Sequence, residues 1–488
     1  MNKIIILDNK TCQLLLTDNP EILNSIRYFL SYKAIGVEYT PAYKNGWNGI
    51  TFLMDKKGVV PIGLLGRVKS FLDNKKIVYE VDDKRISFKF DKPIDILSKL
   101  KKLKKEPRDY QIAILEATKK HDRGIIRACT GSGKTNAIAM CIAEHTGITI
   151  VFVIGLSLLN QFHEVLSLIF KEEIGYIGNS ICNIKRINVC SIWTAAKCLD
   201  LKDIIIDDEI DDGLKETFNQ NHQLNILNLL KQTKLIFCDE CHSINCMSMV
   251  NLFKILNPEK CYGFSATPFR DDGSDLTAHA YLGEKIIDIT ASELIKRGIL
   301  AKPIIKFVDV PPEIIEGRTY QQIYGEYVVE NETRNSLIVK ETKNLVDKKY
   351  KVLVLFKNIK HGKNLSKLFE QYGLRFGLLS GKDPIEDRLE VQRQIENDEI
   401  DVILASKIMN TGVDIPILSG LVLAGGGKSS IAITQSVGRC LRKYPGKTIA
   451  AVVDFYDNVR YLKKHSQIRY KIYKSEPGFQ VMPNKNFK

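Results

Sequence analysis

One stretch, Ile125–Thr135 (IIRACTGSGKT), restricts the possible folds of this chain more than any other. A short apolar run leads into a glycine-containing turn, then Lys134 and Thr135, then a sequence that favours a helix. This order predicts a buried strand and a loop whose backbone N–H groups surround phosphate oxygens. The following helix points its positive N-terminal end at the same anion. We predict a nucleoside triphosphate site, with Lys134 at the β- and γ-phosphates and the Thr135 hydroxyl at Mg²⁺. The remaining loop residues of this site are Thr130, Gly131, Ser132 and Gly133.

The loop departs from the usual phosphate-binding pattern at one position. The pattern G-x-x-x-x-G-K-[ST] begins here with Ala128. Taken alone, such a match is also compatible with a chance glycine turn. Arg108 and Gln111 lie upstream of the loop, where a Gln amide, which both donates and accepts hydrogen bonds, can recognise the edge of adenine.

Two later stretches could supply the acidic partner of Mg²⁺. Ile204–Glu209 (IIIDDE) and Leu235–His242 (LIFCDECH) are both apolar runs that end in Asp-Glu. The first continues into further carboxylates, which would repel a phosphate. The second is followed by Tyr262–Pro268 (YGFSATP). We therefore predict that Asp239 holds Mg²⁺ and that Glu240 orients or deprotonates the attacking water.

A second α/β region begins at Lys351. Short apolar runs alternate there with helix-compatible segments, which predicts a second parallel sheet with crossover helices. The stretch Gln435–Arg442 (QSVGRCLR) is helix-like, and Arg439 and Arg442 are spaced to share one helical face. Two guanidinium groups so placed would suit a triphosphate transition state completed from a second domain. The expected strands are 352–356, 376–380, 401–405, 421–424 and 448–455.

Composition is compatible with a polyanion as partner. The 488 residues suffice for roughly three domains, and no apolar run approaches the ~20 residues of a membrane-spanning helix. The formal net charge of +14 favours nucleic acid first and an anionic membrane second. The eleven scattered cysteines indicate free thiols in a reducing compartment. Zinc binding by Cys238, Cys241 and His242 is the alternative, but no second ligand pair follows. We expect a cytoplasmic protein, in the host cytoplasm if it is phage-encoded.

The N-terminal residues 1–95 are predicted to form a small α+β unit. Its expected strands are 4–7, 49–54, 77–81 and 86–90, and its expected helices are 22–32 and 64–71. Trp47 lies in a turn with aromatic and basic neighbours, where nucleic-acid stacking and core packing are equally good interpretations. The lysine-rich run 99–105 is either a solvated linker or a phosphate contact. The stretch from 463 to the end is basic and aromatic.

Hydroxyl groups at predicted strand ends are suited to the phosphates of a nucleic-acid backbone. Ser191 and Thr194 end the predicted strand 188–194, within a repeated strand–turn–helix order. Together with Trp47, the expected nucleic-acid contacts are Ser157, Ser191, Thr194, Lys357, Ser406 and Thr411.

Taken together, these motifs resemble the superfamily 2 helicases and translocases. Five motifs occur in that superfamily's order over roughly residues 105–457: Thr130–Thr135, Asp239–His242, Ser265–Thr267, Thr411–Asp414 and Gln435–Arg442. The N-terminal turn around Trp47, the stretch Pro61–Phe71 and the segment Thr434–Tyr444 resemble the phage UvsW-type branch-migration helicases within it.

The resemblance implies two RecA-like parallel-sheet lobes that close on ATP and Mg²⁺, with nucleic acid lying across both. It implies adenine binding by Arg108 and Gln111, and arginine-finger roles for Arg439 and Arg442. Gln435 would approach the γ-phosphate or the water. It further implies nucleotide contacts by Gly412 and Asp414, and coupling of nucleotide state to lobe movement by Ser265, Ala266 and Thr267.

We therefore expect an ATP-dependent DNA helicase that unwinds or branch-migrates forked and four-way DNA in replication, recombination and repair. The expected partners are branched or forked DNA and single-stranded DNA, with no membrane partner and a monomeric chain. An RNA helicase or a duplex translocase without strand separation is the first alternative, and a non-catalytic branched-DNA-binding protein is the second. The expected domains are an N-terminal accessory DNA-binding domain (1–98), lobe 1 (99–300), lobe 2 (301–457) and a basic tail (458–488).

Overall fold

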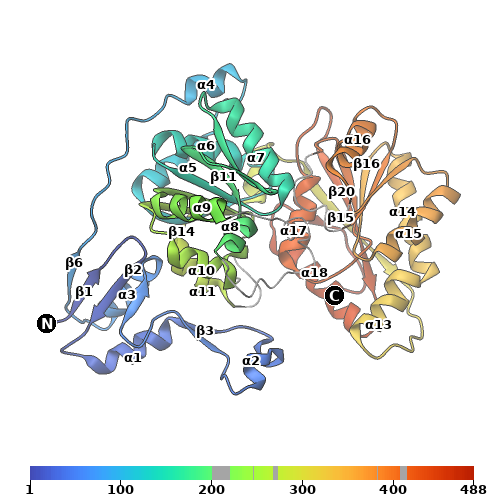
Figure 1. Cartoon of the computed structure of the whole chain (residues 1–488). Coiled ribbons are helices and arrows are strands. Elements are labelled where there is room, and N and C mark those ends of the chain that lie inside the picture. The colour runs from blue at the N-terminus through green and yellow to red at the C-terminus, as the bar shows by residue number, and fades with distance from the viewer. Residues whose placement is uncertain (200–219, 246, 268–272, 382, 407–414, 488) are drawn as a thin grey trace. The chain divides into compact units, whose positions relative to one another are not determined.

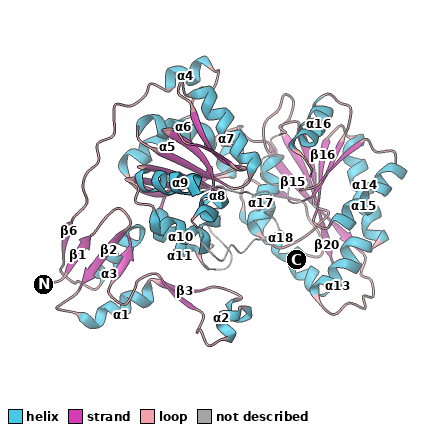
Figure 2. Cartoon of the chain, in the orientation of Figure 1, coloured by secondary structure: helices cyan, strands magenta, loops and turns pink. Residues whose placement is uncertain are grey.

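The structure is a computed structural model of the chain (Figure 1). It describes residues 1–199, 220–245, 247–267, 273–381, 383–406 and 415–487. The chain divides into two compact units, with the main boundary between Ile289 and Thr290; the short stretch Cys129–Ser132 groups with the second unit. Figure 2 shows strands gathered into sheets with helices around them. Both large sheets are parallel, apart from one short strand in the first. The predicted fold class of two RecA-like parallel-sheet lobes with a small N-terminal α+β domain is confirmed.

The first unit begins with a small four-stranded sheet. Its strands are β1 (Lys3–Ile6), β2 (Thr11–Leu15), β5 (Val59–Pro61) and β6 (Glu80–Asp83), in the order β5-β2-β1-β6. Alternate residues of β1 and β2 are buried, so one face of this sheet packs on a core. Helices α1 (Pro20–Phe29) and α3 (Leu65–Asn74) contribute to that core. Strands β3 (Ser31–Lys33) and β4 (Ile50–Phe52) pair separately.

Two N-terminal predictions need correction. Residues 86–90 do not form a strand: Ile86 is 89% exposed, and Phe90 packs on His145 instead of pairing in the N-terminal sheet. Strand β2 was not predicted, because its apolar residues alternate with polar ones over only a few positions.

The larger sheet of the first unit has the order β10-β9-β11-β8-β12-β13-β7-β14. Strands β8, β11, β12 and β13 are buried along their whole length, as expected of a parallel sheet covered on both faces. The strands are β7 (Arg123–Ala128), β8 (Thr149–Val153), β9 (Ile174–Gly178), β10 (Ile181–Asn183), β11 (Ile187–Ser191), β12 (Leu235–Asp239), β13 (Lys260–Ser265) and β14 (Lys285–Ile289). The helices are α4 (Leu97–Lys102), α5 (Asp109–Lys120), α6 (Lys134–Glu144), α7 (Leu156–Ile169), α8 (Ile192–Cys198), α9 (Gln220–Gln232), α10 (Met247–Ile255) and α11 (Asp275–Leu282).

The second unit contains a parallel sheet of order β17-β18-β16-β19-β20-β15-β21. The predicted strands of this region are confirmed to within a few residues. The strands are β15 (Lys302–Val310), β16 (Lys351–Phe356), β17 (Phe376–Leu379), β18 (Val402–Ser406), β19 (Leu418–Val422), β20 (Ile449–Asp457) and β21 (Gln480–Val481). The helices are α12 (Ala291–Lys296), α13 (Tyr320–Tyr324), the π-helix η4 (Gly325–Glu330), α14 (Glu332–Asp347), α15 (Ile359–Gln371), α16 (Ile385–Glu396), α17 (Ser430–Arg439) and α18 (Arg460–Ser475).

The segment that we expected to be a basic tail is a packed part of the second unit. Helix α18 buries Arg469 against Asp454, with Nε 2.9 Å from Oδ2, and β21 joins the sheet beside β15. Buried charge pairs of this kind require tertiary neighbours, which composition does not reveal. Among the described residues, no helix combines the length and the apolar character needed to cross a bilayer.

Candidate nucleotide-hydrolysis site

The predicted phosphate loop follows directly from strand β7. Gly131 and Gly133 have φ angles of +82° and +78°, which favour glycine because a Cβ would be strained there. Helix α6 begins at Lys134, so its N-terminal N–H groups face the loop. Ala128 is the last residue of β7 and has strand conformation. The first glycine of the usual pattern is therefore not needed for backbone geometry here.

Gln111 fastens this loop to the helix before it. Its side chain is buried, and Nε2 donates to the carbonyl of Gly133 at 3.1 Å. Its Oε1 accepts from the backbone N–H of Arg108 at 2.9 Å, which caps α5. The Arg108 guanidinium donates to the Tyr110 hydroxyl at 2.6 Å. Gln111 thus has a structural role at the loop, and its predicted contact with adenine stays a prediction.

The centre of the site is Lys134 between two carboxylates. Its Nζ lies 3.3 Å from Asp239 Oδ1 and 3.1 Å from Glu240 Oε1. Strands β12, β13 and β7 are parallel neighbours, so Asp239 and the phosphate loop meet at the carboxyl edge of the sheet. Burial disfavours the charged amine, but the two carboxylates outweigh it and raise the pKa of Lys134. Lys134 is therefore protonated, as a phosphate ligand must be.

Glu240 connects this centre to the segment after β13. Its φ of +51° places a non-glycine residue in the left-handed region, a strain that concentrates at functional sites. The Ser265 hydroxyl donates to Glu240 Oε2 at 3.4 Å and accepts from the backbone N–H of Thr267 at 3.1 Å. His242 Nδ1 lies 3.1 Å from Ser265 Oγ and 3.4 Å from Glu240 Oε2. A change at the carboxylate can therefore reach Ser265 and Thr267 through direct contacts.

His242 is a site residue for which the sequence suggested only the alternative role of a zinc ligand. Its contacts with Ser265 and Glu240 are tertiary and join β13 to the turn after β12. The available signal was its position directly after Asp239-Glu240-Cys241. Cys241 itself is fully buried, and a Cβ built on Gly263 would lie 2.8 Å from its Cβ, so it packs against β13.

In the second unit, the predicted helix carries only one of the two arginines. Helix α17 ends at Arg439, with Cys440 as its C-cap. Arg442 follows the helix and forms a β-bridge with Leu300. The prediction that Arg439 and Arg442 share one helical face was wrong. The chain turns at Cys440, and the residues after it pair with the segment at Leu300 and Ala301. Gln435 does lie on α17 with Arg439.

The predicted nucleic-acid contacts lie in different environments. Ser191 is buried and caps α8 by accepting from the Thr194 N–H at 3.4 Å, and Thr194 is fully buried. The structure does not expose these two hydroxyls. Ser406 is buried at the end of β18, Lys357 is exposed after β16, and Ser157 lies in the first turn of α7. Trp47 is 38% exposed and donates to Ile50 O at 3.2 Å.

Several predicted positions lie outside the described residues. These are Thr411, Gly412 and Asp414, together with the acidic stretch 203–212.

Comparisons with known proteins agree with this arrangement along the chain. Residues 7–82 match the family of the N-terminal domain of the DNA helicase UvsW. Residues 104–270 match the res subunit of type III restriction enzymes, and residues 333–444 match the conserved C-terminal helicase domain. The chain belongs to the superfamily 2 helicases.

Similar proteins include viral helicases. The ATP-dependent DNA helicase UvsW of Enterobacteria phage T4 is 27% identical, over 95% of this chain and 95% of its own length. Putative helicase 22 of a Sulfolobus islandicus filamentous virus is 25% identical, over 74% of this chain and 66% of its own. In fold alone, this helicase resembles S. cerevisiae Dbp5 bound to RNA and ADP BeF3, with a TM-score of 0.55 and 14% identity, over 80% of this chain and 94% of that one.

A buried network of this helicase holds the glycine turn Ala424–Gly427, which leads into α17. Tyr324 donates to Gly425 O at 2.8 Å, and Arg334 donates to Ala424 O at 2.7 Å. Arg469 donates to Gly427 O at 2.8 Å. The ion pairs Arg334–Asp457 (2.8 Å) and Arg469–Asp454 (2.9 Å) fix these arginines from β20. This network cannot be recognised from the sequence, because its members lie far apart in the chain.

Proposed function

We propose that this helicase uses ATP hydrolysis to move on DNA and that it remodels forked and four-way junctions. The observation that carries the proposal is the arrangement of Lys134, Asp239 and Glu240 at the carboxyl edge of the first sheet. DNA as the substrate is suggested by the relative from phage T4, which is an ATP-dependent DNA helicase similar over nearly the whole chain; the preference for forked and four-way DNA follows from the resemblance of the N-terminal motifs to branch-migration helicases. The net charge of +14 supports a polyanionic partner.

The residues present fit a nucleotide with Mg²⁺. Two carboxylates and one ammonium leave one net negative charge, which suits a divalent cation, and carboxylate and hydroxyl oxygens are the ligands that Mg²⁺ prefers. Asp239 and Thr135 would hold the ion, which supplies charge neutralisation at the phosphates. Lys134 would exchange its carboxylate partners for phosphate oxygens, and Glu240 would then be released to orient the attacking water.

The second unit would complete the site from α17. Arg439 and Gln435 are proposed to reach the triphosphate when the two lobes close, with Arg442 contributing from the segment after the helix. Gly412 and Asp414 are proposed as further nucleotide contacts. Closure is favoured only if the nucleotide binds the closed state more tightly than the open one. Ser265 and Thr267 would transmit the change at Glu240, since they contact it directly or through one hydrogen bond.

DNA binding is proposed to depend on backbone phosphates rather than on bases. Such binding is selective for shape and falls with salt, because released counterions drive it. We propose a monomer with an N-terminal DNA-binding domain that includes Trp47, and single-stranded DNA as a further ligand. The proposed N-terminal domain is 1–98, followed by lobe 1 up to residue 289 and lobe 2 from residue 290 onward, which includes the segment 458–488 expected as a tail. The proposed compartment is the cytoplasm.

The test is ATP-dependent processing of a labelled four-way junction, beside a fork and a blunt linear duplex. Lys134→Ala protein serves as the blank. We expect junction and fork processing with little action on the duplex. ATP hydrolysis without strand movement on any substrate would indicate a duplex translocase, an alternative that the restriction-enzyme match of lobe 1 also favours. Stimulation of hydrolysis by RNA alone would indicate an RNA enzyme, and no hydrolysis with any nucleic acid would indicate a binding protein.

A further inference from the structure

Helix α11 lies against the catalytic edge of lobe 1. It follows the Ser265-Ala266-Thr267 segment in the chain and packs on the turn after Asp239-Glu240. A Cβ built on Gly263 would lie 2.3 Å from Leu282 Cδ1 and 2.8 Å from Cys241 Cβ. Strand β13, the turn at Cys241 and α11 are thus in contact so close that only glycine fits between them. The turn at Cys241 and α11 thus share a close contact at Gly263.

The opposite side of α11 belongs to the core of the N-terminal domain. Ala280 is fully buried in that domain's hydrophobic cluster, with Leu276 and Tyr281 packed beside it. A Cβ built on Gly63 would lie 2.2 Å from His279 O and 2.6 Å from Ala280 O. Backbone here packs directly on backbone. The Thr277 hydroxyl also donates to the Tyr32 hydroxyl at 2.8 Å, which adds strand β3 to the contact.

Polar contacts at the edge of this interface also join the N-terminal domain to the end of α11. Arg67 donates to Glu284 through Nε at 2.5 Å and Nη2 at 3.3 Å, and His279 Nδ1 lies 3.2 Å from Glu284 Oε2. The hydrogen bond with His279, together with that from Arg67, lowers the pKa of Glu284 to about 2 against the opposing effect of burial. Glu284 is therefore an acceptor at neutral pH. The pair is half-exposed, so its contribution is screened.

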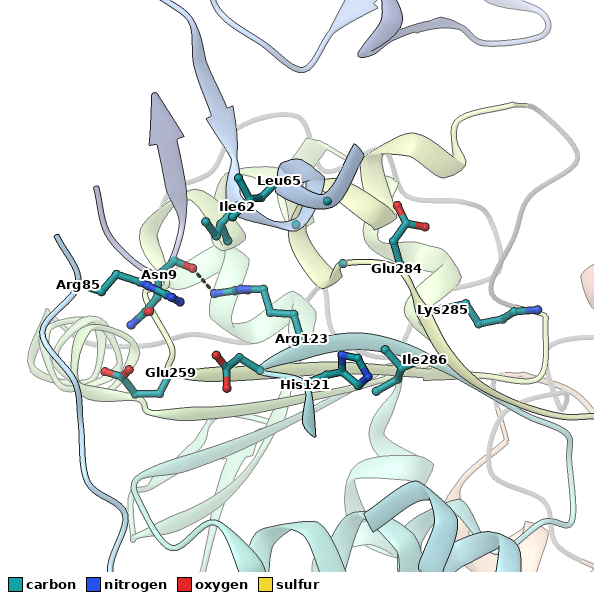
Figure 3. Close-up of a pocket in the computed structure, with 14 residues that line it drawn as sticks. Asn9, Ile62, Leu65, Arg85, His121, Arg123, Glu259, Glu284, Lys285 and Ile286 are labelled. Carbon is teal, nitrogen blue, oxygen red and sulfur yellow. Dashed lines mark hydrogen bonds between the residues drawn. The ribbon is translucent and has the colours of Figure 1, made fainter. Parts of the chain in front are cut away.

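Arg123, the first residue of β7, also takes part in the interface between α11 and the N-terminal domain. Figure 3 shows its side chain reaching from the lobe toward Asn9, to whose carbonyl it donates a short hydrogen bond. It also donates to the carbonyls of Tyr281, at the end of α11 (3.0 Å), and of Pro258 (3.2 Å). The strand that leads to the phosphate loop, the end of α11 and the N-terminal domain thus share one guanidinium.

We propose that α11 is a coupling element that transmits nucleotide-dependent movement at Glu240 and Ser265 to the N-terminal domain, through the contact of Gly63 and Arg67 with His279–Glu284. The inference rests on the proposed function, because only a motor on DNA needs such transmission. It assigns the N-terminal domain a role in converting ATP turnover into strand movement, beyond holding DNA.

The test compares two neighbouring glycines. Gly63→Ala places a methyl group against backbone oxygens, whereas Gly66→Ala meets nothing within 4 Å and is the matched control. For Gly63→Ala we expect DNA-stimulated ATP hydrolysis to persist while junction strands moved per ATP fall by about tenfold, a usual size for coupling between sites. The control should behave as the unaltered protein. An unchanged ratio of strand movement to hydrolysis in Gly63→Ala would overturn the proposal.

Charge reversals at Arg67 and Glu284 test the proposal without disturbing the packing at Gly63. Arg67→Glu and Glu284→Arg should each lower strand movement per ATP, and the double variant should restore it. Failure of the double variant to recover would count against the proposal if junction binding and thermal unfolding match those of the unaltered protein.

Hydrogen exchange with a non-hydrolysable ATP analogue reads the transmission directly. Nucleotide should change exchange in residues 275–284 and also in 58–67, and Gly63→Ala should abolish only the second change. No nucleotide effect on 58–67 in the unaltered protein would refute the coupling role. Loss of ATP hydrolysis by the unaltered protein with DNA would instead refute the proposed function, so the two failures are distinguishable.

Discussion

At the scale of single residues, Lys134 has two roles that require different partners. Without nucleotide it neutralises the buried Asp239 and the partly buried Glu240, which carry like charge. With nucleotide it is proposed to serve the phosphates. The ion pairs hold its ammonium at the place where the phosphates arrive, so little rearrangement is needed.

Lys134→Ala should abolish ATP hydrolysis, by about 10²- to 10³-fold or more, because charge on the transferred phosphate is no longer stabilised. Binding to a labelled junction should be largely retained, since the proposed contacts with the DNA backbone lie elsewhere. The variant should also be less stable in urea by about 2 kcal/mol, because two carboxylates lose their counter-charge. Lys120→Ala, at an exposed position, is the control. Equal loss of hydrolysis and DNA binding would show that Lys134 is structural.

Arg439→Ala should leave ATP binding largely intact and remove turnover, because an arginine finger acts on charge that develops in the transition state. Binding of a fluorescent ATP analogue and steady-state hydrolysis measure the two effects separately. The exposed neighbour Lys443→Ala is the control. Normal turnover in Arg439→Ala would rule out the finger role.

At the scale of elements, the position of α17 depends on the glycine turn before it. Tyr324, Arg334 and Arg469 reach this turn from three different helices and bind its carbonyls. A carbonyl left without its donor in this buried place costs about 1–3 kcal/mol, so the turn has one strongly preferred conformation. The network thus fixes the turn that leads into α17, the helix that carries Arg439.

Tyr324→Phe should lower the free energy of unfolding by about 1 kcal/mol, through the lost hydrogen bond to Gly425. It should also reduce kcat more than KM, because the start of α17 becomes less well positioned. Urea unfolding and steady-state kinetics are the measurements, with the half-exposed Tyr372→Phe as control. A drop in stability with unchanged kcat would limit the network to folding.

Helix α15 contributes a pH dependence. Burial, helped by the charge of Arg334, lowers the pKa of His361 from 6.5 to about 3. As the pH falls, the unfolded chain protonates His361 near pH 6.5, whereas the folded chain does so only near pH 3. The stability contributed by neutral His361 is therefore complete above pH 6.5. It is lost as the pH falls toward 3, by up to about 1.4 kcal/mol per pH unit. His361→Gln should flatten the fall of melting temperature between pH 6.5 and 4. The exposed His121→Gln should not, and equal slopes in all three proteins would contradict the assignment.

At the scale of the whole molecule, the proposed cycle requires that nucleotide and DNA change the arrangement of the two units. Each unit has its own parallel sheet and core, so each can move as a body. The resemblance implies closure on ATP. Closure would then bring together two parts of the site, the phosphate loop and Arg439, that come from different regions of the chain.

Small-angle scattering should therefore show a smaller radius of gyration when a non-hydrolysable ATP analogue and a short duplex are added together. Each ligand alone should produce a smaller change, because closure is favoured by differential binding of both. Lys134→Ala should not compact with the analogue. An unchanged radius in the unaltered protein with both ligands bound would contradict closure.

The sequence alone determined the fold class and the family and predicted the nucleotide site, because these depend on local order. An apolar strand, two glycines and a lysine at the start of a helix specify the phosphate loop within one stretch of chain. Asp239 was chosen over Asp207 from the residues that follow it, and the structure brings Asp239 to Lys134. The parallel sheets followed from repeated buried strands with helix-compatible segments between them.

Only the tertiary structure decided how distant segments meet. The end of α17 before Arg442, the packing of α18, the contacts of His242 and the network around Ala424–Gly427 all depend on partners far away in sequence. The contact of Gly63 with α11 is of the same kind. That a Cβ at Gly63 would clash with backbone oxygens of α11 is seen only in the tertiary structure. Local propensity is weak compared with packing and buried charge, so these features could not be read from the order of residues.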